Sequence, residues 1–198
     1  MKNKQCKVFL AASALLFCAT FTPLAFAGDD FYVGAGVGIS QSKDACDGLG
    51  GAGFTGTCDK KDSGFKLVAG YKFTPYLGAE VGYVSLGEFK AVGTAGATAI
   101  DATAKAKGLQ LAGFGMLELD EDFWFIGKLG VFSWDLDSSG SLASSSETGT
   151  DLFFSIGVQY DVSRRFSIRG EWEKFMDVGV SGAESDIDLI SVNGLWRF

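Results

Sequence analysis

The residues of this 198-residue sequence that could carry out chemistry are charged side chains at alternate positions of apolar segments. Histidine, the usual general base, is absent, so acid–base catalysis would depend on Glu80, Glu171 and Glu173. Basic residues at matching positions are natural ion-pair partners for these acids, and structural pairs need no catalytic role. We therefore predict no enzyme, and we predict ion pairs inside a fold among Lys66, Lys72, Glu80, Lys128, Arg169, Glu171, Glu173 and Arg197.

The first 27 residues have the pattern of a secretory signal peptide. Three lysines precede an apolar run over residues 8–21, and Ala25 and Ala27 are the small residues that a signal peptidase reads. The alternative, a membrane anchor, would need about 20 apolar residues to cross a bilayer as a helix. We expect cleavage after Ala27, which leaves residues 28–198 as one domain and takes the formal charge from −7 to −10. Such an acidic chain disfavours nucleic acid as a partner.

Two cysteines, Cys46 and Cys58, remain after this cleavage. In an exported protein an even count favours one disulfide, here across a glycine-rich segment. A metal site is the alternative, but two thiols without histidine make a poor ligand set. The glycine run at residues 34–38 resembles a phosphate-binding loop, but it lies in an expected strand with no helix after it. We expect no metal and no cofactor.

The elements that must position the charged residues are strands. Segments of about ten residues alternate between apolar and polar side chains, which is typical of β-strands, and no helical period of any length occurs. In the fourth segment the alternation slips between Leu109, Leu111 and then Phe114, Met116, so we expect a β-bulge there. The eight expected strands cover residues 31–40, 64–73, 76–85, 105–117, 123–131, 151–160, 166–173 and 186–198.

Short and long connections alternate along these eight strands. The short ones lie between strands two and three, four and five, and six and seven; the others are expected to be long polar loops at residues 41–63, 87–104, 135–149 and 176–185. Short turns on one side, long loops on the other and an even strand count are typical of an outer-membrane barrel. The pattern predicts an all-β fold, an eight-stranded antiparallel up-and-down transmembrane β-barrel.

The composition of the two strand faces indicates which face meets lipid. One face is apolar, while the other carries the charged set above among glycines, which suits a packed polar lumen. In a soluble barrel the apolar face would be inside and the charged face outside. A soluble β-sandwich remains the alternative. We expect the apolar faces to contact lipid, with Phe31, Phe73, Phe123, Tyr160, Phe166 and Phe198 as an aromatic girdle at the turn side.

Short motifs at residues 31–38, 70–80, 128–130, 157–160 and 168–172, together with the terminal Phe198, resemble the OmpA-like outer-membrane β-barrel family over the whole mature chain. The resemblance implies export through the periplasm, with chaperones, and insertion by the barrel-assembly machinery. In such families this machinery reads a final strand that ends in an aromatic, here with Trp196 and Phe198. The sequence stops at Phe198 without a peptidoglycan-binding domain, so we do not expect cell-wall anchoring.

The expected function is structural and surface-interacting, through the long loops of an outer-membrane barrel in contact with lipid and lipopolysaccharide. Loops held by a rigid scaffold are where binding usually occurs, so an extracellular ligand is compatible with this plan. A narrow pore is the alternative, and it requires a continuous water path past the lumen charges. A lipid-modifying enzyme is the third hypothesis, disfavoured by the absence of histidine.

Overall fold

The computed structural model describes residues 30–43, 54–95, 98–140, 144–179 and 184–198. All of its regular elements are strands: β1 (Phe31–Ser42), β2 (Phe54–Asp59), β3 (Lys61–Lys72), β4 (Leu77–Ala95), β5 (Thr98–Asp120), β6 (Phe123–Gly140), β7 (Ser144–Asp161), β8 (Phe166–Val178) and β9 (Ser185–Arg197). In these segments there is no helix long and apolar enough to cross a membrane.

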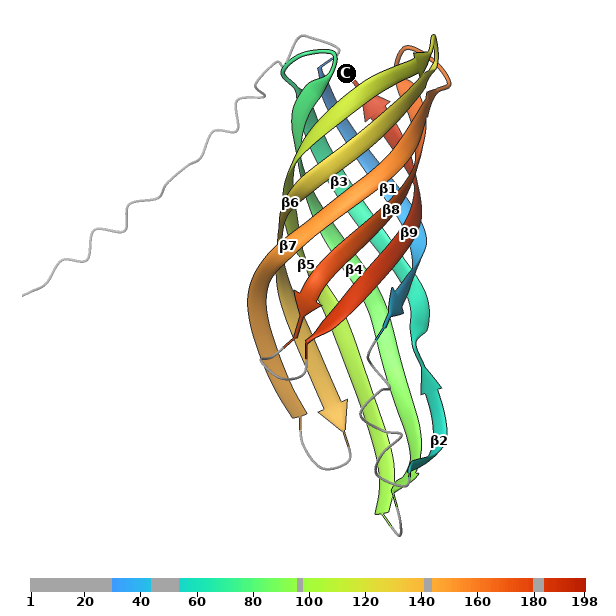
Figure 1. The fold of residues 1–198 in the computed structure, drawn as a ribbon, viewed down its shortest axis with the longest axis vertical. Helices are drawn as coiled ribbons and strands as arrows, with labels where there is room; N and C mark the ends of the chain where they lie inside the picture. The colour runs from blue at the N-terminus through green and yellow to red at the C-terminus, as the bar shows by residue number, and fades with distance from the viewer. Residues whose placement is uncertain (1–29, 44–53, 96–97, 141–143, 180–183) are drawn as a thin grey trace, which may run out of the picture.

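The nine strands close into an eight-stranded antiparallel barrel, in which β2 and β3 together take one strand position. From β3 to β9 each strand pairs with the next one along the chain, and β1 closes the ring by pairing with both β3 and β9. The short strand β2 continues the line of β3 alongside β4, because β3 pairs with residues 78–85 of β4 and β2 pairs with residues 90–95. Figure 1 shows the closed ring, with Phe198 at the turn end. The predicted fold class is confirmed.

The alternation of the two faces is confirmed by burial. On β9, Ile190, Val192 and Trp196 are exposed, whereas Leu189 and Leu195 are buried in the lumen. Glycines let the inward face of β1 approach its neighbour closely. A Cβ atom at Gly36 would lie 2.0 Å from the side-chain oxygen of Asn193, so no larger residue fits there without displacing that side chain.

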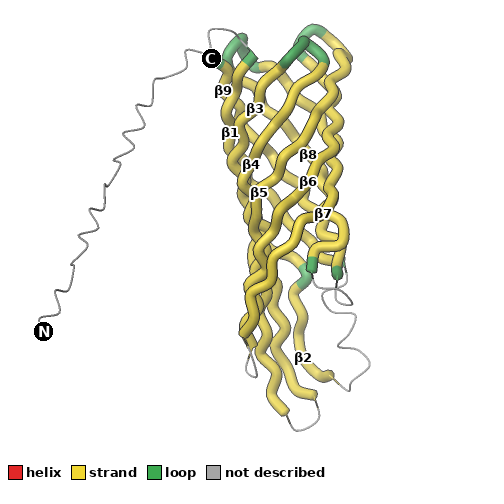
Figure 2. The backbone as a smooth tube through the Cα atoms, turned by 90° about the vertical axis from the view of Figure 1, so that its left-hand side faces the viewer, coloured by secondary structure: helices red, strands yellow, loops and turns green. Residues whose placement is uncertain are grey.

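Four strands are longer than the sequence pattern predicts. Strands β4, β5, β6 and β7 have 19, 23, 18 and 18 residues, whereas β1, β3, β8 and β9 have 12 or 13. The expected loops at residues 87–104 and 135–149 are therefore mostly paired strands, and the expected loop at 41–63 contains β2. We call the part of the sheet formed by β2 and by residues 87–95, 98–106, 133–140 and 144–151 the extension; Figures 1 and 2 show it projecting from the end opposite Phe198.

The bulge expected in the fourth segment is wrong. Strand β5 keeps one register with β6 from Ala102 to Glu118, and both Phe114 and Met116 simply point into the lumen. Irregularities occur instead between Ser85 and Glu88 of β4, between Glu118 and Asp120, and between Phe175 and Val178. Gly87, with a φ of 83°, supplies the left-handed conformation that the first of these requires.

Candidate functional site

The middle of the lumen is filled by six charged residues, which we call the charge cluster: Lys66, Glu80, Lys128, Arg169, Glu171 and Glu173. They come from β3, β4, β6 and β8, and each is at most 4% exposed. Three acids face three bases, so the cluster is formally neutral, as a buried set of charges must be to avoid a large desolvation cost.

Short ion pairs connect the members of the charge cluster across the lumen. Lys66 lies 2.8 Å from Glu171 and 2.7 Å from Glu173. Lys128 lies 2.5 Å from both Glu80 and Glu171. Arg169 donates to Glu80 at 2.8 Å. Because each of the three bases contacts at least one acid, the arrangement locks strands that are not neighbours in the sheet.

Neutral polar residues complete this network, and sequence reasoning assigned them no such role. Tyr32 donates its hydroxyl to Glu80 at 2.6 Å, and its ring lies 5.2 Å from the Arg169 guanidinium. Gln159 accepts hydrogen bonds from Arg169, and Asn193 donates to Glu171. The only sequence signal for these contacts was that all three side chains fall on the inward face.

Two of the eight predicted lumen charges do not join the charge cluster. Lys72 and Arg197 lie near the turn end, where the barrel opens. Arg197 forms an ion pair with Asp161 at 2.5 Å and donates to Ser167, while Lys72 sits 5.9 Å from the ring centroid of Trp124. Position along the strand, rather than charge, separates them from the other six.

Apolar layers close the lumen on both sides of the charge cluster, which corrects the expectation of a uniformly polar interior. Toward the turn end lies the inner layer, Tyr32, Val68, Phe114, Met116, Ile126 and Leu195. Toward the extension lies the larger outer layer, Val84, Leu86, Phe89, Ala106, Ala112, Phe132, Trp134, Phe153, Phe175, Val178, Ile187 and Leu189. In the outer layer the Phe132 and Phe175 ring centroids are 4.6 Å apart. The packed rings leave the charge cluster enclosed between two apolar plugs.

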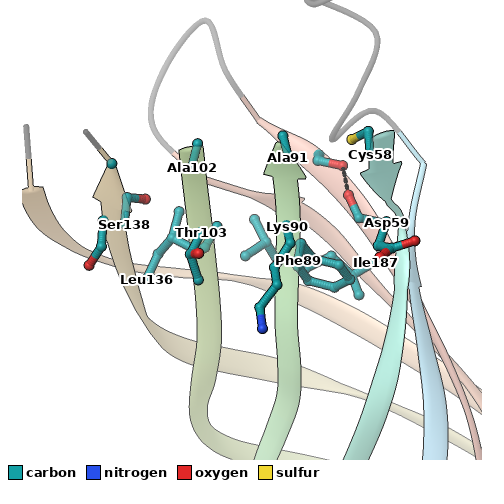
Figure 3. Close-up of a pocket in the computed structure, with 16 residues that line it drawn as sticks. Cys58, Asp59, Phe89, Lys90, Ala91, Ala102, Thr103, Leu136, Ser138 and Ile187 are labelled. Atoms are coloured by element: carbon teal, nitrogen blue, oxygen red, sulfur yellow. Dashed lines mark hydrogen bonds between the residues drawn. The ribbon is translucent and has the colours of Figure 1, made fainter. Parts of the chain in front are cut away.

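Beyond the outer layer the barrel opens into a cavity of about 340 Å³, which we call the mouth cavity. Its walls include Phe89, Ala91, Leu136, Ser138 and Ile187, from β4, β6 and β9 (Figure 3). Trp134 of the outer layer donates its indole N–H to Asp151 at 2.6 Å, which fixes that ring at the base of the extension. The mouth cavity is thus a hollow at the open end, floored by packed aromatic residues.

Solvent-accessible ion pairs lie in the extension and at its base. Glu88 lies 2.8 Å from Lys105 and 3.0 Å from Lys90, and hydrogen bonds from both lysines hold the pKa of its carboxyl below the ordinary value. Asp137 accepts a hydrogen bond from Lys107 at 3.1 Å, which lowers the pKa of the aspartate. Solvent-accessible ion pairs contribute little to the free energy of unfolding, so their main effect here is to keep this surface hydrated.

The remaining predicted residues lie at the ends of the chain or in its first connection. Cys58 is disulfide-bonded, but Cys46 falls outside the described residues, so the predicted pairing of these two cysteines stays a prediction. Ala25 and Ala27 also fall outside them. Among the described residues no group of three or more His, Cys, Asp or Glu side chains could hold a metal ion.

The C-terminal aromatics contact the start of the chain. Phe198 donates its backbone N–H to the Phe31 carbonyl at 3.1 Å, and the two rings are 5.7 Å apart. Trp196 is 48% exposed on the apolar face. Phe123 and Tyr160 pair at the same end, with ring centroids 4.7 Å apart. Aromatic residues therefore ring the turn end, as a membrane-interface girdle does.

A barrel with an apolar outer face, a charged and filled lumen and an aromatic girdle matches a known family over almost all of its length. The model of the OmpA-like transmembrane domain family matches residues 26–198. The chain belongs to this OmpA-like family. It is 29% identical over 201 residues to outer membrane protein A of Serratia marcescens, a match that covers 94% of this chain and 54% of that protein.

Solved structures of other outer-membrane barrels share the OmpA-like fold. Neisserial surface protein A (NspA) has a TM-score of 0.59 at 15% identity, covering 85% of this chain and 97% of that one. Ail, the attachment invasion locus protein of Yersinia pestis, solved in complex with the heparin analogue sucrose octasulfate, has a TM-score of 0.51 at 18% identity, covering 85% and 99%. At these identities the likeness concerns the fold alone.

The OmpA-like chain spans about half the length of the curated relatives that it matches. The shared half is the membrane domain, and its family and fold place the protein in the outer membrane of a Gram-negative bacterium. It is an integral outer-membrane β-barrel whose exposed apolar side chains contact lipid.

Proposed function

We propose that this barrel is a surface-interaction protein whose contact surface is the extension. The observation that carries the proposal is strand length. A tilted strand needs about 9–11 residues to cross the hydrocarbon core. Strands β4–β7 have 18–23 residues, so they exceed this need by roughly 8–13 residues, or about 26–43 Å of strand at ~3.3 Å per residue. Structure of that reach has no role in spanning the bilayer.

The extension would face the outside of the cell. In outer-membrane barrels the short turns face the periplasm and the longer connections face outward. Here the turns near Pro75, Glu121 and Ser163 lie at the end that carries Phe198, opposite the extension. Labelling tests this orientation: Thr148→Cys in the extension should react with a membrane-impermeant maleimide on intact cells, whereas Val162→Cys in a turn should react only after the membrane is broken. The reverse pattern would contradict the proposal.

The charges of the extension indicate which kind of partner surface it suits. Ail was solved with a heparin analogue, which would suggest a polyanion, but acidic neighbours accompany several lysines of this end: Lys90 and Lys105 with Glu88, and Lys107 with Asp137. Such mixed charge favours a neutral or mixed partner surface over a uniformly anionic one. We therefore propose contact with host or environmental surfaces through polar and hydrogen-bonding groups.

Trimming one hairpin tests the interaction role. Deleting residues 136–147 and joining Asp135 to Thr148 through an Asn-Gly turn keeps the pairing of these two residues and leaves the membrane part intact. Cells with the trimmed protein should lose attachment to immobilised matrix proteins or glycans that cells with the full protein bind. Heat-modifiable gel mobility checks that the trimmed barrel is folded. Equal attachment to every surface tested would refute the role of this hairpin.

Assembly partners form part of the proposal. After cleavage behind Ala27, periplasmic chaperones would carry the chain to the barrel-assembly machinery, which would recognise the last strand with Trp196 and Phe198. In place, the outward apolar face would contact membrane lipid and lipopolysaccharide. The girdle at the turn end and the contact between Phe198 and Phe31 support a role for these aromatics at the closing seam.

The pore and enzyme hypotheses are less well supported. A pore needs continuous water, whereas the inner and outer apolar layers pack on both sides of the charge cluster. The lumen acids Glu80 and Glu171 are engaged in ion pairs, which leaves them poorly placed for acid–base work. In planar bilayers the purified barrel should form no stable channels, and lipid A mass spectra should be unchanged by deletion of the gene. Stable channels that disappear with Arg169→Ala would favour the pore instead.

A further inference from the structure

The inward-facing residues change size where the barrel becomes the extension. Within the outer layer they are large: Phe132 and Trp134 on β6, Phe153 on β7 and Phe175 on β8. A few residues farther out, the inward positions carry Ala91 on β4, Ala102 and Ala104 on β5, and Ser138 and Gly140 on β6. Facing strands thus switch to small side chains at the same height, and the space that these leave is the mouth cavity.

The mouth cavity has the size and chemistry of a small-molecule site. Its volume of about 340 Å³ lies within the ~300–1,000 Å³ range of such sites, and it is far too small for a folded partner. Phe89 is 7% and Ile187 4% exposed, and together with Leu136 they form an apolar wall. Phe89 and Ile187 belong to the outer layer and Leu136 packs against it, so this wall of the site is largely preformed.

Most of the polar residues on the lining carry hydroxyls; Asp59 and Lys90 also line it, and Lys90 forms an ion pair with Glu88. Ser138 lies on β6, and Ser42 and Ser185 approach each other from β1 and β9 with their Oγ atoms 2.8 Å apart. Hydroxyl groups can both donate and accept, so they match an alcohol or amide better than a charged group. Apolar walls with a few hydroxyls at one side select amphipathic ligands.

We propose that the mouth cavity binds a small uncharged amphipathic molecule, with an apolar body against Phe89, Leu136 and Ile187 and a hydroxyl or amide group toward the serines. This site does not depend on the proposed surface interaction, because it lies on the inward side of the extension and is assayed on the purified barrel. The alanines on the lining keep this space open, because a larger side chain at any of these positions would fill it.

The alanine methyl groups provide a direct test. In the full mature chain in lipid nanodiscs, labelled on alanine methyls, 2-phenylethanol serves as the probe because its ring shifts nearby methyl resonances. Ala91, Ala102 and Ala104 line the cavity, whereas Ala99 lies on the opposite face of β5. We expect saturable shifts for the three lining alanines and none for Ala99. Alanines on the lipid face would change only linearly, as the probe partitions into the bilayer.

Filling the cavity gives the matched control. Ala104→Leu should abolish the saturable shifts of Ala91 and Ala102 or raise the apparent Kd at least tenfold, and Ala99→Leu should leave them unchanged. Heat-modifiable mobility and otherwise unchanged spectra verify folding of both variants. If Ala104→Leu does not fold, Ser138→Leu, which faces Ala104 on β6, provides a second filling variant. Linear shifts at all alanines, or saturable shifts that survive filling, would overturn the proposal.

Discussion

The charge cluster gives a sharp prediction for Glu80→Gln. The Glu80 carboxylate contacts Lys128 at 2.5 Å and Arg169 at 2.8 Å, and it accepts the Tyr32 hydroxyl at 2.6 Å. A glutamine keeps the size but removes the charge, so three bases then face two acids. Breaking a buried pair from one side costs about 3–5 kcal/mol, because the remaining charge stays buried without its partner.

Glu88→Gln is the matched control for this variant. Glu88 also contacts two lysines, at 2.8 and 3.0 Å, but at a partly exposed site where water replaces lost contacts. Urea unfolding in lipid vesicles, followed by tryptophan fluorescence, should show a large loss of stability for Glu80→Gln and overlapping curves for Glu88→Gln and wild type. Equal unfolding curves for the two variants would refute the claim that the charge cluster stabilises the barrel because it is buried.

A second charge removal should restore part of the lost stability. In Glu80→Gln combined with Lys128→Met, two acids again face two bases, although Arg169 still lacks its partner. The double-mutant cycle should give a favourable coupling of roughly 0.5–3 kcal/mol. A coupling near zero would mean that the two residues act independently, despite their contact at 2.5 Å.

Three further predictions concern the lipid face, assembly and pH. Val192→Arg on the exposed apolar face should cost about 2–4 kcal/mol near the midplane, whereas Val92→Arg on the extension should leave the urea midpoint unchanged. Phe198→Ser should lower outer-membrane levels far more than Phe73→Ser does, with little change in the midpoint of refolded protein; normal levels would argue against a terminal signal. Because its pKa is lowered in the fold, Asp137 contributes a small stability above its ordinary pKa of 3.8 that is lost as pH falls through the folded pKa; the protection factors of amide hydrogens should therefore decrease slightly in the extension in acid, but not in the membrane strands.

The sequence predicted the membrane part of the fold well, because a strand between lipid and a filled lumen must alternate. It failed for the extension, since both faces there meet water and the alternation disappears. Residues 98–104 contain three alanines and an aspartate, which have low strand propensity, so this stretch was expected to be loop. Strand pairing with β4 and β6 overrides this local preference.

The partners within the charge cluster were harder to predict than its members. Alternation placed Lys66 and Glu171 on inward faces, but they belong to β3 and β8, and their 2.8 Å contact depends on how the closed ring staggers its strands. The slip seen at Phe114 and Met116 has a related cause. Where the inward side chains form an apolar layer, both faces of the strand are apolar, and the sequence then does not show which residues point into the lumen.

Residues 144–152 of β7 pair only with β6 among the described residues, because β8 begins its pairing with β7 at Phe153. The outer backbone groups of this stretch are therefore open to other chains, which in a crowded membrane is a hazard for strand-to-strand aggregation. Its side chains are mostly serine, threonine, glycine and acids, with Glu147 and Asp151 supplying negative charge. If two copies paired along this edge, their negative charges would lie side by side. We therefore expect this edge to remain unpaired with other chains even when the protein is dense in the membrane.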